Sequence, residues 1–153
     1  MSSRTTQHSY TIKEAAALTG LPPSTLRYYE SIGVIAPVSR GASSKHRLYD
    51  EDDLDQIMWV ACLAATGMSV SDMRQYVVNG RLGPQAATEQ IELLQQQERR
   101  LAAEAEQIAL RTRYVRLKAD YWAAVRAGDE ARTALLTTEA RALADELKRG
   151  ARR

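Results

Sequence analysis

Ser24-Thr25-Leu26-Arg27-Tyr28-Tyr29-Glu30 is the stretch that decides the fold, because it opens a second helix directly after the break Gly20-Leu21-Pro22-Pro23. Proline in a first helical turn loses no hydrogen bond, since the N–H groups there have no partner within the helix. Ser24 or Thr25 can cap that end of the helix. Helix, glycine-containing turn and helix together outline a helix-turn-helix, a motif whose second helix enters the major groove of DNA.

Arg27, Tyr28 and Tyr29 occupy successive positions, so their side chains fan out around the helix instead of forming one buried stripe. A guanidinium group beside two phenols suits contacts with phosphates and base edges. The alternative is that the tyrosines pack in the core, and we expect this of one of the two. The seven residues as a whole predict a helix that reads DNA.

The composition is that of a protein with one core, or with one small domain and an extension. The chain has 153 residues, of which 44% are hydrophobic and 26% are charged. No apolar run approaches the ~20 residues of a membrane helix, and the polar start of the chain lacks the apolar segment of a signal peptide. We therefore expect a cytoplasmic protein that does not contact the membrane.

Few residues of the chain are suited to catalysis or to metal binding. The single cysteine excludes an internal disulfide and a cysteine cluster for a metal. The two histidines, the lack of a glycine-rich phosphate loop and the lack of a carboxylate–histidine spacing give no support to an enzyme. The sequence thus predicts a protein that is not an enzyme and that uses no metal or cofactor.

The net charge of +2 hides an uneven distribution of charged residues. Residues 1–49 contain six basic residues against the two acids Glu14 and Glu30, a local charge of +4. The basic residues are Arg4, Lys13, Arg27, Arg40, Lys45 and Arg47. A basic region favours nucleic-acid binding, although a solvated charged face gives the same count. The five acids within 50–55 suit the first turn of a helix, where the helix dipole favours negative charge.

Residues 10–80 are expected to form a winged helix-turn-helix domain, preceded by a flexible arm at 1–9. Thr11 and Glu14 have the spacing of a capping box at the start of the first helix. Gly20 is placed to end that helix.

The wing is predicted from two short apolar segments and the basic loop between them. Residues 34–38 and 47–49 have the composition of short strands, and 39–46 is rich in small and basic residues. A two-stranded ribbon with a basic tip can lie along the phosphate backbone of DNA.

Two further helices are expected to complete the domain. Asp50 caps the first of them, which runs to Gly67, and Ser69 begins the second, which ends at Asn79-Gly80. Residues 81–84 read as a hinge, because they contain glycine and proline.

Residues 85–127 contain neither glycine nor proline, and at 1.5 Å per residue they predict one helix of roughly 60 Å. Apolar residues recur along it at alternating spacings of three and four, which is the pattern of a coiled-coil seam. The seam residues are Ile91, Leu94, Leu101, Ile108 and Val115. So long a helix needs a partner to bury this seam, and we therefore predict a homodimer.

A second apolar stripe begins halfway along this helix, at Leu110, Tyr114, Leu117 and Tyr121. A C-terminal helix at 128–149, followed by a basic tail at 150–153, is expected to fold back on it, in the same chain or in the partner. A small apolar effector could bind there, although aromatic side chains at helical spacing more often pack together. Its site would be lined by Tyr114, Tyr121, Trp122 and Leu135.

The fold class is therefore mainly α: an N-terminal winged helix-turn-helix domain, a long coiled-coil dimerisation helix and a short C-terminal helix. This order resembles the MerR family of bacterial transcription regulators. The resemblance is carried by Leu26-Arg27-Tyr28-Tyr29-Glu30, by Arg47-Leu48-Tyr49 and by the turn Thr66-Gly67-Met68. It is close over residues 10–80 and extends to the long helix in architecture only.

The resemblance implies a homodimer with an antiparallel coiled coil, in which each protomer presents its winged helix-turn-helix to one half of a palindromic promoter. Family members bind an overlong promoter spacer and distort it, so that RNA polymerase engages both promoter elements. Such a distortion costs roughly 1–6 kcal/mol, which phosphate contacts offset. The expected location is the cytoplasm, in association with the nucleoid.

Carried over by position, the resemblance also assigns the DNA contacts. The predicted DNA-binding residues are Thr25, Arg27, Tyr28, Tyr29, Arg40, Lys45, His46 and Arg47. Arg27 and Tyr28 would hold DNA from the second helix and Arg47 from the wing. Thr25 and Tyr29 are the weaker candidates.

Cys62 is the candidate residue by which such a regulator could sense its signal. The stretch Cys62-Leu63-Ala64-Ala65-Thr66-Gly67-Met68 resembles the aldehyde- and electrophile-responsive thiol branch of the family, where this cysteine is the sensor. Metal-sensing members carry cysteines after the long helix, and this chain has none beyond residue 62. A sensor thiolate requires exposure, whereas a lone cysteine on an apolar helix is most often a small core residue. One prediction is thus a regulator whose inducer is a reactive aldehyde. The alternative is a DNA-binding protein that responds to no effector.

Overall fold

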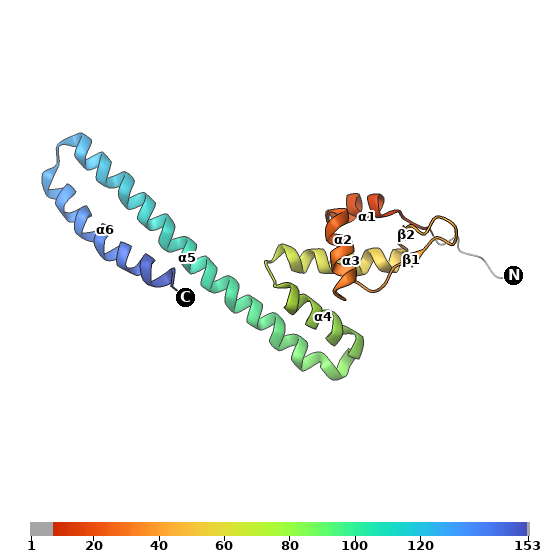
Figure 1. Cartoon of the computed structure of the whole chain (residues 1–153). Helices are drawn as coiled ribbons and strands as arrows, with labels where there is room; N and C mark the ends of the chain where they lie inside the picture. Colours follow the sequence, from red (N-terminus) through yellow and green to blue (C-terminus); the bar gives the residue numbers. More distant parts are fainter. Residues whose placement is uncertain (1–7, 153) are drawn as a thin grey trace. The chain divides into compact units, whose positions relative to one another are not determined.

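The computed structural model of the chain describes residues 8–152 and divides into two compact units, Met1–Leu94 and Gln95–Arg153. Most of the predicted arm (1–7) and the last residue of the predicted tail lie outside the described residues. The first unit contains α1 (Ile12–Thr19), α2 (Pro23–Ser31), β1 (Ser39–Arg40), β2 (Arg47–Leu48), α3 (Glu51–Ala65), α4 (Val70–Leu82), the 3-10 helix η1 (Gly83–Ala86) and the beginning of α5 (Ala87–Ala127) (Figure 1). The second contains the rest of α5 and α6 (Glu130–Gly150). The chain is mainly helical, as predicted.

The first helix begins and ends as predicted from the sequence. The Thr11 hydroxyl accepts a hydrogen bond from the Glu14 amide, and the Glu14 carboxylate accepts one from the Thr11 amide. At the other end Gly20 has φ +75°, a left-handed conformation that a side chain disfavours, and its N–H donates to the Ala16 carbonyl. Both ends of α1 are therefore set by local sequence.

The prediction that Ser24 or Thr25 caps α2 is wrong. The helix begins at Pro23, with Pro22 in the extended conformation before it, and no side chain caps this end. The reason is that proline presets a helical φ and has no N–H to satisfy, so the helix starts earlier than the hydroxyl residues. Ser24 and Thr25 consequently lie inside the first turn.

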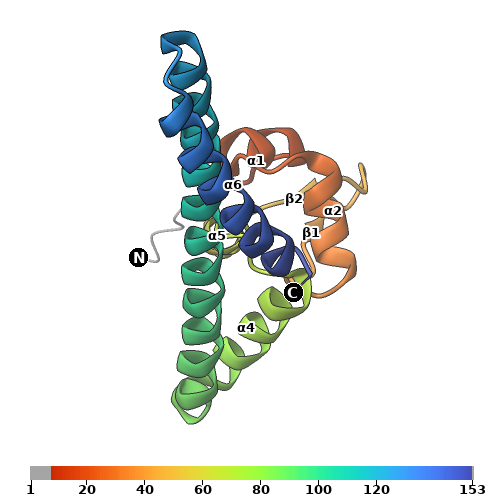
Figure 2. The same cartoon turned by 90° about the vertical axis from the view of Figure 1, so that its left-hand side faces the viewer.

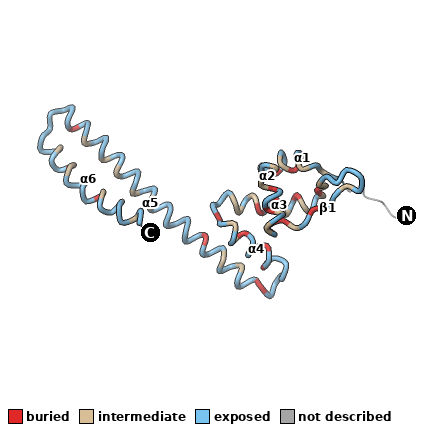
Figure 3. Tube along the Cα trace, in the orientation of Figure 1, coloured by how far each residue is buried: buried red, intermediate tan, exposed pale blue. Residues whose placement is uncertain are grey.

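The first unit has a hydrophobic core of its own. In Figure 3 the buried positions gather on α1 to α4 and on the segments that join them. The most deeply buried side chains are Leu26, Val34, Ile35, Tyr49, Ile57, Val60 and Met73. Burying one such side chain stabilises a fold by about 1.5–3 kcal/mol, so this core holds α1 against both α2 and α3.

The wing is shorter than predicted and begins later. β1 pairs with β2 in antiparallel register, Ser39 with Leu48 and Arg40 with Arg47. The segment 34–38, predicted as the first strand, is irregular and packs in the core. Its backbone amides are already used, because those of Val34 and Ile35 donate to the Tyr29 carbonyl at the end of α2. These donors cannot also form a strand ladder.

The caps predicted for α3 and α4 are confirmed, but α4 runs further than expected. Asp50 and Ser69 accept hydrogen bonds from the amides three residues on. α4 continues through Gly80 to Leu82, and η1 follows at once. The residues 81–84, predicted as a hinge, therefore form the end of one helix and a tight turn, in which Gly83 has φ +70°.

The compact unit continues past the predicted boundary at residue 80, to Leu94. A chain of amide hydrogen bonds joins α4 to the start of α5. Buried Asn79 accepts from Gln75 at 2.8 Å and donates to Gln90 at 3.1 Å, and Gln90 donates to the Tyr76 carbonyl at 2.9 Å. Since all these groups are satisfied, the first turns of α5 are fixed to α4.

In the second unit α6 runs back alongside the second half of α5, as both views show (Figures 1 and 2). Asp129 caps α6 by accepting from the Arg132 amide. One face of α6 is buried, at Leu136, Ala140 and Leu143. Opposite it, the stripe predicted to need a partner is half-buried at Leu110, Tyr114, Leu117 and Tyr121. The C-terminal helix thus folds back within its own chain, and it extends to Gly150, one residue beyond the predicted end.

Candidate DNA-binding surface

α1, α2 and the wing surround a basic cleft of about 240 Å³. Its lining is Thr11, Ile12, Lys13, Arg27, Arg40, His46, Arg47 and Leu48. The capping box places Lys13 in the first turn of α1, and the β1–β2 pairing sets Arg40 opposite Arg47. Four basic side chains and no acid line one cleft, which is the electrostatic footprint of a phosphate-binding surface.

On α2 the structure separates the two adjacent tyrosines. The Tyr28 side chain is 52% exposed, whereas Tyr29 is 8% exposed and belongs to the core. Tyr29 lies three residues after buried Leu26 and so shares its face, while Arg27 and Tyr28 face solvent. The expectation that one tyrosine packs inside is confirmed, and Tyr29 has little surface left for the predicted DNA contact. Thr25 is half-buried.

Arg47 is held by an ion pair that the sequence did not predict. Its Nε donates to the Glu30 carboxylate at 2.7 Å, and the other Glu30 oxygen accepts from the Val38 amide at 2.8 Å. Glu30 belongs to α2 and Arg47 to β2, so the contact attaches the wing to α2. This ion pair positions the wing against α2.

The environment of Glu30 contains opposing influences on its pKa. Burial raises the pKa of this carboxyl, but the hydrogen bonds from Arg47 and Val38 and the charges of Arg47 and Arg40 outweigh it, so that the pKa is lowered overall. The ionised carboxylate therefore stabilises the fold. Its contribution is complete above the ordinary carboxyl pKa of about 4.3 and is lost as the pH falls through the lowered pKa.

Glu30→Gln is expected to lower the free energy of unfolding by about 1 kcal/mol at pH 7, because a charge-assisted hydrogen bond near the surface is partly screened. The deficit should shrink as the pH falls below about 4.3, since wild-type Glu30 is then protonated too. Urea unfolding between pH 3 and 7 measures both effects. Glu92→Gln, which alters an exposed acid of α5, is the matched control. A deficit that is constant with pH would exclude the ion pair as its cause.

The tip of the wing is ordered by its own hydrogen bonds. Arg40 donates to the Lys45 carbonyl at 3.2 Å, and Lys45 has φ +60°, the one positive value outside glycine among the described residues. Arg40, Lys45 and His46 are exposed. Lys45 does not line the basic cleft.

Lys13 is the cleft residue that the sequence reasoning did not select. It is exposed and lines the cleft together with Arg27. The signal that could have identified it was the capping box, which places the residue two positions after the N-cap at the exposed start of the helix.

Cys62 lies on α3 and is exposed. Within this chain the reading of Cys62 as a small core residue is therefore wrong. The buried positions of α3 are Leu54, Ile57 and Val60, which lie on another face of the helix. Among residues 8–152 no group of three or more His, Cys, Asp or Glu side chains could hold a metal ion.

The residues predicted to form the dimer seam are exposed in the single chain. These are Ile91, Leu94, Leu101, Ile108 and Val115, with exposed fractions from 39% to 68%. The stripe leaves apolar side chains in water, as expected of a surface that a second copy covers. In the part of the chain that the structure describes, no helix is long and apolar enough to cross a membrane.

Comparison with known proteins assigns the family. A family model described as MerR HTH family regulatory protein matches residues 10–79. An HTH-type transcriptional regulator of Haemophilus influenzae is 30% identical over 109 residues, which cover 71% of this chain and 78% of that protein. The HTH-type transcriptional regulator AdhR of Bacillus subtilis is 40% identical over 65 residues, or 42% of this chain and 46% of AdhR. The chain spans about half the length of AdhR and of another B. subtilis relative that it matches.

Among solved structures, the fold is similar to that of HiNmlR, described as a MerR family regulator that lacks the sensor domain, bound to promoter DNA. The TM-score is 0.62 and the identity 23%, over 78% of this chain and 94% of HiNmlR. This likeness concerns the fold alone. Together with the family model and the H. influenzae relative, the winged helix-turn-helix and its basic cleft show that this chain belongs to the MerR family of helix-turn-helix regulatory proteins.

Proposed function

We propose that the protein is a transcription regulator that binds a palindromic promoter as a homodimer. The observation that carries this proposal is the basic cleft, in which exposed Arg27 of α2 meets Lys13 of α1 and the arginines of the wing. Phosphate contacts position such a protein, and exposed side chains of α2 read the base edges. The solved HiNmlR structure, which contains promoter DNA, supports the same use of the fold.

The exposed apolar seam on α5 is the reason for proposing that a second protomer binds. Two protomers joined along this seam would present two winged helix-turn-helix units, and a palindromic operator has the matching two-fold symmetry. By family, the bound dimer distorts the promoter spacer so that RNA polymerase engages both promoter elements. The protein would act in the cytoplasm, in association with the nucleoid.

The test is to select binding sites from a random duplex pool and to measure the affinity of the selected operator by fluorescence anisotropy. We expect a palindromic consensus. Eight cations per dimer line the two basic clefts, so affinity should fall roughly 10,000-fold between about 50 and 200 mM salt, through counterion release. A consensus without two-fold symmetry, or an affinity independent of salt, would contradict the proposal.

A second candidate function is the sensing of reactive aldehydes, and the exposure of Cys62 favours it. We infer that the Cys62 thiolate adds to the carbonyl carbon of a reactive aldehyde, forming a carbon–sulfur bond while the oxygen takes a proton from water. Such a reaction needs an accessible thiolate. The competing reading is a regulator without an effector, which would share the DNA-binding unit and α5 but would not respond to aldehydes.

Cys62→Ser is expected to leave operator affinity unchanged, within about twofold, because Cys62 lies outside the basic cleft. It should remove any change in transcript yield that an aldehyde causes in a defined transcription reaction. Ser71→Ala, which alters an exposed hydroxyl in the first turn of α4, is the control. An identical aldehyde response of the Cys62→Ser protein would exclude Cys62 as the sensor.

A further inference from the structure

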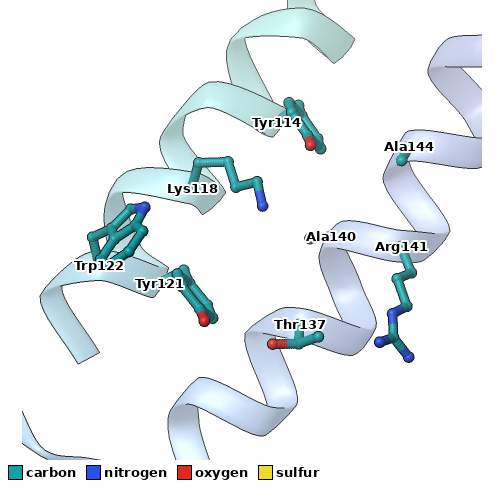
Figure 4. Close-up of a pocket in the computed structure, with 8 residues that line it drawn as sticks. All are labelled: Tyr114, Lys118, Tyr121, Trp122, Thr137, Ala140, Arg141 and Ala144. Carbon is teal, nitrogen blue, oxygen red and sulfur yellow. The ribbon is translucent and has the colours of Figure 1, made fainter. Parts of the chain in front are cut away.

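The second unit contains a groove that the proposed DNA binding does not use. It lies between the second half of α5 and α6 and has a volume of about 370 Å³ (Figure 4). Its lining is Tyr114, Lys118, Tyr121, Trp122, Thr137, Ala140, Arg141 and Ala144. Leu135, which the sequence placed at an effector site, is exposed and outside this lining.

The groove carries positive charge in addition to the aromatic side chains that the sequence predicted there. Lys118 lines it from α5 and Arg141 from α6, and no acidic side chain lines it. Within residues 8–152 neither cation has a carboxylate partner. Two cations without a counter-charge at one concave surface attract an anion.

The cation on α5 is held over aromatic rings. The Lys118 ammonium lies 5.8 Å from the centre of the Tyr114 ring and 5.6 Å from that of Tyr121, within the range of cation–π attraction. Figure 4 shows Lys118 reaching toward α6 between the two tyrosines. The lysine is thus oriented into the groove before any ligand arrives.

The same groove offers flat apolar surface next to these charges. Tyr121 and Trp122 pack edge to face, with ring centres 5.4 Å apart. On the facing helix Ala140 and Ala144 have no bulk beyond Cβ, which leaves space opposite the rings. Aromatic walls favour a planar ligand, which can pack against them by its face or edge.

We propose that this groove binds a small aromatic carboxylate. The carboxylate lies against Lys118, with Arg141 as the second cation, and the ring of the ligand packs against Tyr114, Tyr121 and Trp122. A volume of about 370 Å³ suits a ligand of one or two fused rings. Control of promoter binding by this ligand rests on the proposed function, whereas binding itself does not.

The test uses 2-naphthoate as probe and its neutral amide, 2-naphthamide, as the matched compound. Isothermal titration calorimetry of the full chain without DNA is expected to show saturable binding of 2-naphthoate and binding of 2-naphthamide that is weaker by about tenfold or more. Lys118→Leu should reduce naphthoate affinity to that of the amide. Arg141→Leu should reduce it by about threefold or more. Arg116→Leu, which removes an exposed cation outside the groove, is the control.

Equal binding of the two compounds, unchanged affinity in Lys118→Leu, or no saturable binding of 2-naphthoate would each overturn the proposal. Circular dichroism of the variants confirms that α5 and α6 are folded. Operator affinity with and without 2-naphthoate is measured separately. If naphthoate binds but no operator is found, the proposal that this groove binds an aromatic carboxylate is supported, whereas the proposed function is wrong.

Discussion

Replacing Leu101 with aspartate is expected to convert the dimer into monomers and to abolish operator binding. Leu101 lies at the middle of the predicted seam and is 39% exposed in the single chain, so the substitution does not disturb a core. In the dimer the same position would be covered, and burying an unpaired carboxylate there costs at least about 3 kcal/mol, or roughly 100-fold in the dissociation constant. Sedimentation velocity measures the change in mass directly.

Gln96→Asp is the matched control, because it introduces the same residue on another face of α5, where the side chain is exposed. It should remain dimeric and should bind the operator. The monomeric Leu101→Asp protein retains its winged helix-turn-helix but engages only one half-site, so its affinity should fall to the level of non-specific DNA. Dimers of Leu101→Asp at micromolar concentration would place the interface elsewhere on the chain.

Arg27→Ala is expected to weaken operator binding by roughly 100-fold or more, since each dimer loses two contacts of about 1–3 kcal/mol. Arg27 is exposed and lines the basic cleft. It contributes nothing to the hydrophobic core, so the unfolding midpoint should not change. Anisotropy titrations against the selected operator and a scrambled duplex measure the loss of affinity and of specificity.

Arg81→Ala removes a cation of α4, in the same unit, that lies outside the basic cleft. Its operator affinity should stay within about threefold of wild type, as expected for a distant rim charge. If Arg27→Ala retained wild-type affinity, α2 would not be the reading helix. That result would not contradict the proposed homodimer or the proposed ligand groove between α5 and α6.

Elements whose signals are local were predictable from the sequence. The capping box at Thr11, the N-cap at Asp50 and the left-handed Gly20 act within one helical turn, so their effect does not depend on the rest of the chain. The long helix was predictable for the same reason, because neither glycine nor proline interrupts it. Its predicted bounds of 85–127 differ from the observed Ala87–Ala127 only at the first turn.

Errors arose where two segments compete for one group. The amides of the predicted first strand donate to the end of α2, and α2 starts at a proline before the hydroxyl residues that could cap it. The ion pair between Arg47 and Glu30 was not predicted, because its two residues lie on different elements. Spacing along the chain does not reveal such partners.

Sequence alone determined the family, the order of the helices, the basic N-terminal region and the apolar seam of α5. All of these follow from residue type and short-range periodicity. Tertiary structure decided that Tyr28 is exposed and Tyr29 buried, that Cys62 reaches solvent, and that cations from α5 and α6 share a groove. Burial and electrostatic surroundings depend on which distant segments meet, and only the folded chain brings those segments together.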